Sequence, residues 1–357
     1  MTVVTASKVR TVALISLAFG TALLSSPATA LGSPGHEGEA TGGAQGKQLY
    51  ASASHSNIKV TQVSGPTGGK RGGISSTDVN WKPPPCWYEP VFTPEQLKEF
   101  SETPPALGYV SPHASWGGVK LWTDHYRDRQ GALNLNDDSF STAEGYDNYN
   151  LGKDGYFWRG VAPDTADPES WACDRVMFWQ NAGEIPEIAN APTPRILAEY
   201  AYDKVEVPST EIEMKPEGTS TVNLPAWVWL DKGTFQEIKV RAELPNTGLW
   251  AETTARPVAL HLAPGTDDAV TFPASGDCRI NADNSIGTPY AAGKAAETPP
   301  CGFAYLRATG GTPYQLKTSI TWEVTWQGSD GSRGDLPNGT FETTQDINVQ
   351  EIQSVNR

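Results

Sequence analysis

The stretch Ile320-Thr321-Trp322-Glu323-Val324-Thr325-Trp326-Gln327 alternates without a break between apolar and polar residues. A period of two places successive side chains on opposite faces of a β-strand. Ile320, Trp322, Val324 and Trp326 would therefore share one buried face, and the polar residues between them would face water. This stretch predicts a central strand of a sheet that is buried on one side.

Residues 191–357 contain further alternating segments separated by turn residues. The expected strands are Thr210–Lys215, Thr221–Leu230, Phe235–Leu244, Pro257–Ala263, Tyr314–Gln327 and Thr340–Val355. Repeated short strands with Gly, Pro and Asp between them are typical of antiparallel β-sandwiches. We expect a β-sandwich domain over 191–357, opened by a short helix that is capped by Thr193 and ends near Tyr202.

Residues 81–190 have a different composition, with many Trp and Tyr residues among Gly, Asn and Asp. A short helix is predicted where Thr93 can act as N-cap and Pro94 can occupy the first turn, before a run that ends at Phe100. The rest indicates a loop-rich, aromatic region held by a disulfide. The predicted fold class is therefore mainly β, with one or two short helices preceding the sandwich.

The first 30 residues have the features of a secretory signal peptide. Lys8 and Arg10 precede an apolar run over 12–24, and Ala28-Thr29-Ala30 supplies the small residues of a cleavage site, which makes Leu31 the first mature residue. A membrane anchor is the alternative, but the apolar run is shorter than the ~20 residues that a span needs. We expect a secreted, extracellular protein with no membrane anchor after signal cleavage.

Residues 31–80 are poor in large apolar side chains and rich in Gly and Ser. Such a segment buries too little apolar surface to offset the loss of chain entropy, so we expect a disordered tail. Asn57–Val63 alternates in part and could form one short strand.

Net charge limits the class of partner. Removal of the signal peptide leaves 357 − 30 = 327 residues with 25 basic and 41 acidic side chains, a formal charge of 25 − 41 = −16. A chain this acidic repels nucleic acid and anionic surfaces, so no nucleic-acid partner is expected.

Four cysteines are present, and export to an oxidising compartment favours disulfides between them. Of the three possible connectivities, we predict Cys86–Cys173 and Cys278–Cys301, one pair in each region. A zinc site is the alternative, but no CxxC pair is present and the histidines have no ligand spacing relative to the cysteines.

The sequence contains no GxSxG elbow, HExxH helix or P-loop, and we assign no catalytic residue, metal or cofactor. His125 is flanked by Asp124 and Asp128, either of which could orient its imidazole. Asn134–Asp138 and Asp147–Asn150 offer oxygen ligands for calcium, although the same residues dominate ordinary turns.

Aromatic residues near Asn and Asp also suit sugar binding, because ring faces stack on pyranose faces. The candidate ligand-binding residues are Trp116, Trp122, His125, Tyr149 and Trp158. The same aromatic residues commonly fill a core. We expect a non-enzymatic binding or structural protein whose partner is an extracellular glycan or cell-wall component. The alternative is a polysaccharide hydrolase with its site within 105–180.

Several stretches together resemble a group of uncharacterised secreted proteins from actinomycetes. They are the signal peptide, Trp81–Pro90, Val222–Leu230, Cys278–Cys301, Ile320–Gln327 and Asp346–Arg357. The C-terminal region is also similar to PKD-like and Ig-like sandwich modules. That resemblance implies a fold and leaves function open, because fold does not determine function.

Overall fold

The computed structural model of the chain describes most residues from 40 to 352. The described ranges are 40–45, 48–53, 56–66, 70–102, 125–129, 145–164, 167–173, 175, 177–209, 212–230 and 235–352. The predicted signal peptide lies outside them. No helix within these ranges is both long enough and apolar enough to cross a membrane.

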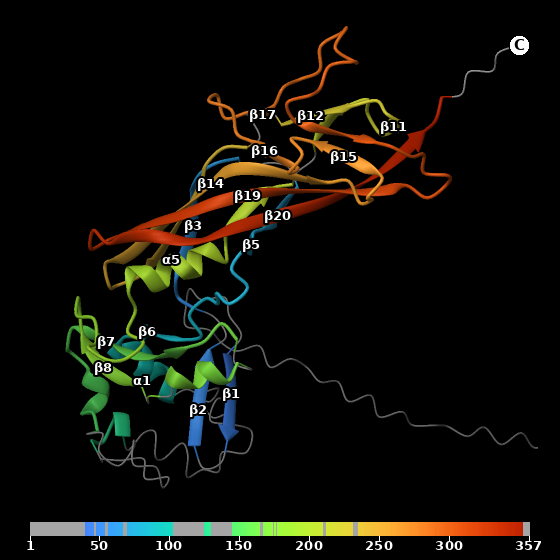
Figure 1. Cartoon of the computed structure of the whole chain (residues 1–357). Helices are drawn as coiled ribbons and strands as arrows, with labels where there is room; N and C mark the ends of the chain where they lie inside the picture. Colours follow the sequence, from blue (N-terminus) through green and yellow to red (C-terminus); the bar gives the residue numbers. More distant parts are fainter. Residues whose placement is uncertain are drawn as a thin grey trace, which may run out of the picture.

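An eight-stranded sheet forms the largest part of the fold, and the quoted stretch lies in its centre (Figure 1). Its main path runs through β11 (Thr219–Thr221), β20 (Arg333–Gln350), β19 (Tyr314–Gly328), β14 (Leu249–Ala263), β13 (Ile238–Leu244) and β3 (Lys59–Ser64). β16 (Asp277–Arg279) pairs with β14, and β5 (Ser75–Ser76) pairs with β20. All pairs are antiparallel except β11 with β20.

Alternation sets the inner face of this sheet as predicted. Ile320, Trp322 and Val324 are fully buried, and Trp326 is half-buried against the same core. Pro257 lies in β14 at the point where its register with β19 shifts. A bulge accommodates proline in a central strand because its nitrogen cannot donate to the ladder.

A second, five-stranded sheet packs against one half of that inner face, which gives the sandwich-like arrangement. It contains β10 (Glu213–Lys215), β12 (Ala226–Leu230), β18 (Gly302–Tyr305) and β15 (Ala269–Phe272), and β17 (Ile286–Gly287) pairs with β12. Tyr305 of β18 stacks on Tyr314 of β19 with ring centroids 4.9 Å apart. The core therefore continues from one sheet to the other.

Helix α5 (Pro194–Tyr202) covers the other half of the inner face. Thr193 caps it as predicted, and its Oγ1 accepts a hydrogen bond from the backbone nitrogen of Ile196. Leu197, Ala198 and Ala201 are fully buried against the sheet. Buried Thr253 donates to the carbonyl of Ala198 at 3.0 Å, which ties the helix to β14.

The region 81–190 is more regular than the predicted loops. β6 (Trp87–Phe92), β7 (Gly155–Val161) and β8 (Phe178–Asn181) form an antiparallel sheet, and β2 (Gln48–Ala53) and β1 (Ala40–Gln45) extend it. Helix α1 (Pro94–Glu102) begins after Thr93 as predicted, and the turns η1 (Asn148–Asn150) and η2 (Pro168–Cys173) complete this part. Most of its buried aromatic residues form two small cores of their own.

The prediction of a disordered tail to residue 80 is wrong for the described strands after residue 56. β3 pairs with β13, β4 (Arg71–Gly73) pairs with β9 (Glu206–Pro208), and β5 pairs with β20. Composition underestimated these strands because they depend on backbone pairing to strands far away in the sequence more than on their own apolar content. The partial alternation of Asn57–Val63 correctly indicated β3.

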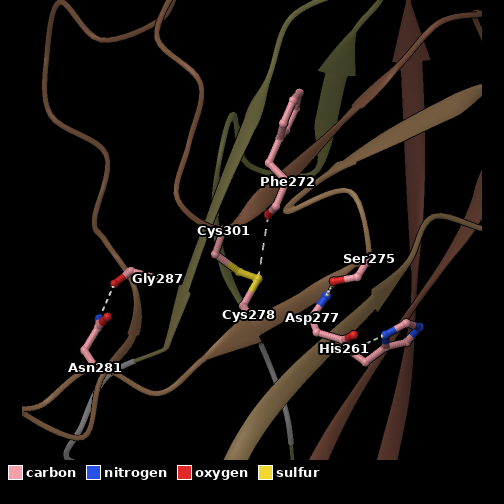
Figure 2. The surroundings of a disulfide bond; sticks show 8 residues. All are labelled: His261, Phe272, Ser275, Asp277, Cys278, Asn281, Gly287 and Cys301. Carbon is pink, nitrogen blue, oxygen red and sulfur yellow. Dashed lines mark hydrogen bonds and ion pairs between the residues drawn. A yellow bond between two sulfur atoms is a disulfide. The ribbon is translucent and has the colours of Figure 1, made fainter.

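Both predicted disulfides are confirmed. Cys86–Cys173 joins the residue before β6 to the last residue of η2, 87 positions later in the sequence. Cys278–Cys301 spans 23 residues and joins β16 of the larger sheet to the residue before β18 of the smaller one (Figure 2). The second disulfide therefore links the two sheets of the sandwich. Two disulfides indicate an oxidising, extracellular environment.

Candidate ligand-binding face

The outer face of the five-stranded sheet carries aromatic residues at neighbouring positions. Residues directly opposite each other on paired strands share a face. Trp227 of β12 lies opposite Lys215 and Gly302, and Gly302 lies opposite Phe272. Trp229, two residues further along β12, lies on the same face. Val228 of the same strand faces inward and belongs to the core.

Trp229 is half-buried, and its orientation is fixed by a neighbouring carboxylate. Its Nε1 donates a hydrogen bond of 2.6 Å to Oε2 of Glu213, which lies opposite it on β10. Glu213 and Lys215 are both exposed. An aromatic ring therefore lies beside two accessible charged groups on one surface.

Further apolar side chains are exposed on the five-stranded sheet. Val270 of β15 is 41% exposed and lies opposite buried Ala304. Leu306, just beyond β18, is 48% exposed, and Phe272 is half-buried. Exposed apolar residues that adjoin one another are typical of interaction surfaces, whereas isolated ones are not.

Trp227 is covered by the segment that leads from β17 to Cys301. The Tyr290 ring meets it edge-on with centroids 6.0 Å apart, and Lys294 Nζ lies 5.8 Å from the indole centroid. Trp227 is consequently only 3% exposed, and its Nε1 has no hydrogen-bond partner among the described residues.

The outer face of the eight-stranded sheet differs in character. Its charged side chains pair with one another: Arg256 with Glu323 at 2.8 Å, and Lys317 with Glu342 at 3.2 Å. Trp250, also half-buried, has the Arg241 guanidinium 4.0 Å from its ring centroid. The two outer faces of the sandwich are thus a paired, charged one and an aromatic one.

Three of the five residues predicted to bind ligand are buried. His125, Tyr149 and Trp158 are 3%, 0% and 2% exposed and pack in the aromatic cores of the region 81–190. No glycan can stack on them in this conformation, so the core interpretation holds for these three. Trp116 and Trp122 lie outside the described residues.

His125 packs edge-on against Tyr126 and Tyr146, with ring centroids 4.6 and 5.4 Å away. Asp128, which the sequence suggested could orient His125, instead receives two 2.7 Å hydrogen bonds from Arg127. Burial lowers the pKa of His125 because the imidazolium would lose its hydration. These contacts describe a buried neutral histidine.

A buried carboxylate, Glu89 of β6, connects the sheet of the region 81–190 to the segment that precedes β3. It accepts hydrogen bonds from Ser56 Oγ, from the backbone nitrogen of Asn57 at 2.6 Å and from Trp87 Nε1 at 2.5 Å. Arg159 lies opposite it on β7. Its contacts anchor the segment before β3 to β6, which is a structural role.

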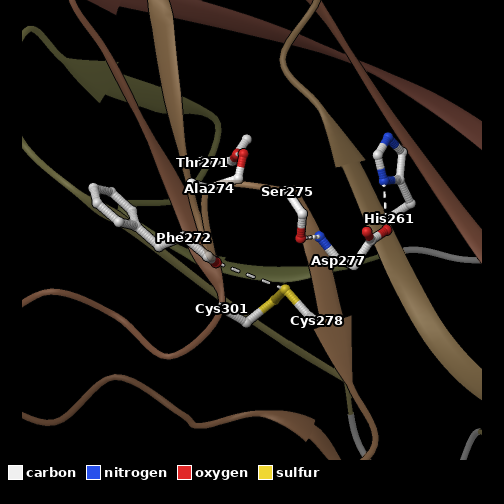
Figure 3. Close-up of polar contacts among 8 residues, drawn as sticks. All are labelled: His261, Thr271, Phe272, Ala274, Ser275, Asp277, Cys278 and Cys301. Atoms are coloured by element: carbon white, nitrogen blue, oxygen red, sulfur yellow. Dashed lines mark hydrogen bonds and ion pairs between the residues drawn. A yellow bond between two sulfur atoms is a disulfide. The ribbon is translucent and has the colours of Figure 1, made fainter.

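His261 and Asp277 form the most accessible histidine–carboxylate pair of the described chain. His261 Nδ1 lies 2.8 Å from Asp277 Oδ1 across β14 and β16, and both side chains are about half exposed. Ser275 Oγ accepts a hydrogen bond from the Asp277 backbone nitrogen and lies on the side of Asp277 away from His261 (Figure 3). The arrangement therefore lacks the serine–histidine contact of a hydrolase triad. His261 instead forms a cross-strand contact with Asp277.

Within the described ranges, no three potential metal-binding side chains come together. Of the two suggested calcium loops, Asn134–Asp138 lies outside these ranges. In the other, Asn150 is buried and its Oδ1 accepts a hydrogen bond from Lys153 Nζ at 2.8 Å. This amide oxygen is already used within the protein.

The aromatic outer face was not predicted as a site, although its signal is in the sequence. Every residue in Ala226-Trp227-Val228-Trp229-Leu230 is apolar, so both faces of this strand are apolar. The strand around Trp322 alternates strictly and has one apolar face. A strand that is apolar on both faces needs a covering on each. The sequence shows that requirement but leaves open what the covering is.

Comparison with known proteins adds no relative: no family model, curated protein or solved structure matches this chain.

Proposed function

We propose that this chain is a secreted, non-enzymatic protein that binds an extracellular or cell-wall polysaccharide through the outer face of its five-stranded sheet. The signal-peptide features of residues 1–30 and the two disulfides support an extracellular location. The disulfide between the sheets keeps the aromatic face on a rigid support.

The observation that carries this proposal is Trp229. Its ring is half exposed and held in place by the hydrogen bond to Glu213, so little conformational entropy is lost when a ligand stacks on it. Glu213 and Lys215 supply a carboxylate acceptor and an ammonium donor beside the ring. An aromatic face with flanking polar groups suits a pyranose, which has apolar C–H faces and hydroxyls at its edge.

Charge narrows the class of polysaccharide. The predicted mature chain carries a formal charge of 25 − 41 = −16, which repels polyanions such as phosphate-rich wall polymers. We therefore propose a neutral, pyranose-containing polysaccharide as the ligand.

Binding of the full exported chain to a panel of insoluble neutral polysaccharides tests the proposal. Trp229→Ala should weaken binding by about fivefold or more, since aromatic anchors of binding sites typically cost more than about 1 kcal/mol when truncated. Glu213→Gln should give a smaller loss. Trp250→Ala is the matched control, because Trp250 is also half-buried in a strand but on the opposite outer face.

The outcome that would contradict the proposal is equal binding by Trp229→Ala and Trp250→Ala. Release of reducing sugar by the unaltered chain would instead favour the alternative, a polysaccharide hydrolase with its site within 105–180.

A further inference from the structure

Residues 288–300, here called the flap, connect β17 to Cys301 and touch the aromatic face at few points. Tyr290 and Lys294 are half-buried and Pro299 is buried, whereas the other flap residues are exposed. Tyr290 and Lys294 contact the Trp227 ring, and Pro299 lies over Gly302, where a side chain would come within 2.8 Å of its Cγ. The flap thus covers the aromatic face through three side chains.

The flap's hydrogen bonds are local. Lys294 and Glu297 donate backbone hydrogen bonds to Ala291 and Lys294, at 3.2 and 3.0 Å, and their side chains form an ion pair at 3.4 Å. Within the described chain, no hydrogen bond joins the flap to the sheet beneath it. A segment held by a few side-chain contacts opens at a lower free energy than the strands that flank it.

Both ends of the flap are fixed. β17 pairs with β12 before it, and Cys301 is bonded to Cys278 after it. Opening would therefore lift Tyr290 and Lys294 from the sheet without detaching the segment. Trp227 would then be exposed two residues from Trp229 on the same face of β12, about 6–7 Å away along the strand.

We propose that the flap is a lid over a second sugar subsite, in which a pyranose stacks on Trp227 beside the one on Trp229. The Trp227 Nε1, which lacks a partner among the described residues, would donate to a ligand hydroxyl. This inference rests on the proposed function, because the ligand is the same neutral polysaccharide. It adds that the site is partly closed when empty.

The first test needs no ligand. In Tyr290→Ala/Lys294→Ala the flap keeps its length but loses both contacts with the indole. N-bromosuccinimide oxidation of the full chain, located by peptide mass spectrometry, should then proceed several-fold faster at Trp227. Trp322, which is fully buried, is the internal reference, and Thr298→Ala, at an exposed flap position, is the matched control. Unchanged oxidation of Trp227 would overturn the lid.

The second test uses the polysaccharide that the unaltered chain binds. Tyr290→Ala/Lys294→Ala should bind it several-fold more tightly, because the cost of opening is removed. Adding Trp227→Leu should abolish that gain. Unchanged or weaker binding by the double variant would overturn the second subsite. If the proposed function itself were wrong, Trp229→Ala would not affect binding, whereas a wrong lid would leave the Trp229→Ala loss intact.

Discussion

At the scale of single residues, Glu89 shows two opposing effects on one carboxylate. Its hydrogen bonds from Ser56, Asn57 and Trp87, and the nearby Arg159, favour the ionised form. Removal from water favours the neutral form and outweighs them, so burial raises the pKa of Glu89 above its usual value. No sequence pattern indicated this residue, because two of its partners, Ser56 and Asn57, come from a segment more than 30 positions away.

Truncating Glu89 should destabilise the protein strongly. Glu89→Ala leaves several buried donors without an acceptor, so we expect a loss of about 3 kcal/mol or more in the free energy of unfolding. Glu89→Gln keeps one acceptor oxygen and should cost less. Urea titration measures both, with Glu187→Ala as an exposed control. A loss for Glu89→Ala no larger than that for Glu187→Ala would show that these hydrogen bonds do not form.

His125 predicts a pH dependence of stability. Its pKa is lowered in the folded state, so the unfolded state binds the proton more tightly. Its contribution is fully present above about pH 6.5 and is lost as the pH falls through that value toward the lowered pKa. Subtracting the pH profile of His125→Phe from that of the unaltered chain isolates this effect. Below about pH 6.5 the free energy of unfolding of the unaltered chain should fall relative to that of His125→Phe. A difference that does not change with pH would contradict the burial of a neutral imidazole.

At the scale of elements, capping residues and alternating patterns in the sequence identified the helices and the long central strand. Thr93 and Thr193 marked the starts of α1 and α5, and strict alternation marked β19. β15, β16, β17 and β18 were missed because they are two to four residues long and depend on pairing across a disulfide-linked loop. The start of β14 was missed too, because Pro257 suggested a strand boundary where the structure has a bulge.

The strand β19 gives a sharp contrast between neighbouring residues. Trp322 is fully buried, whereas Thr321 is on the opposite face. Trp322→Ala should therefore cost about 3–5 kcal/mol of unfolding free energy through lost burial and the cavity left behind. Thr321→Ala should change it by less than about 1 kcal/mol. A denaturant titration compares them, and equal tolerance would mean that the assigned inner face is exposed.

At the scale of the whole molecule, residues on both sides of the boundary predicted near residue 190 pack against one another. Trp87 of β6 and Val161 of β7 belong to the same buried cluster as α5 and the sandwich. Trp87 also meets Tyr200 of α5 with ring centroids 5.4 Å apart. The sequence could not show this, because composition reports what a segment contains and not which segment it packs against.

Removing residues 31–80 should lower the melting temperature. The deletion takes away β3, β4 and β5, which pair with β13, β9 and β20, and removes Ser56 and Asn57, two of the hydrogen-bond donors to Glu89. Differential scanning calorimetry of chains beginning at residues 31 and 81 measures the effect. Identical melting temperatures would restore the interpretation of this segment as a dispensable tail.

The central claim is that the aromatic outer face of the five-stranded sheet binds a neutral polysaccharide. Hydroxyl-radical footprinting of the full exported chain, with and without the polysaccharide that it retains, tests this most directly. We predict that the ligand protects Trp229 from oxidation several-fold and leaves Trp250 unchanged. Unaltered oxidation of Trp229 at saturating ligand, or protection centred on Trp250, would contradict the account.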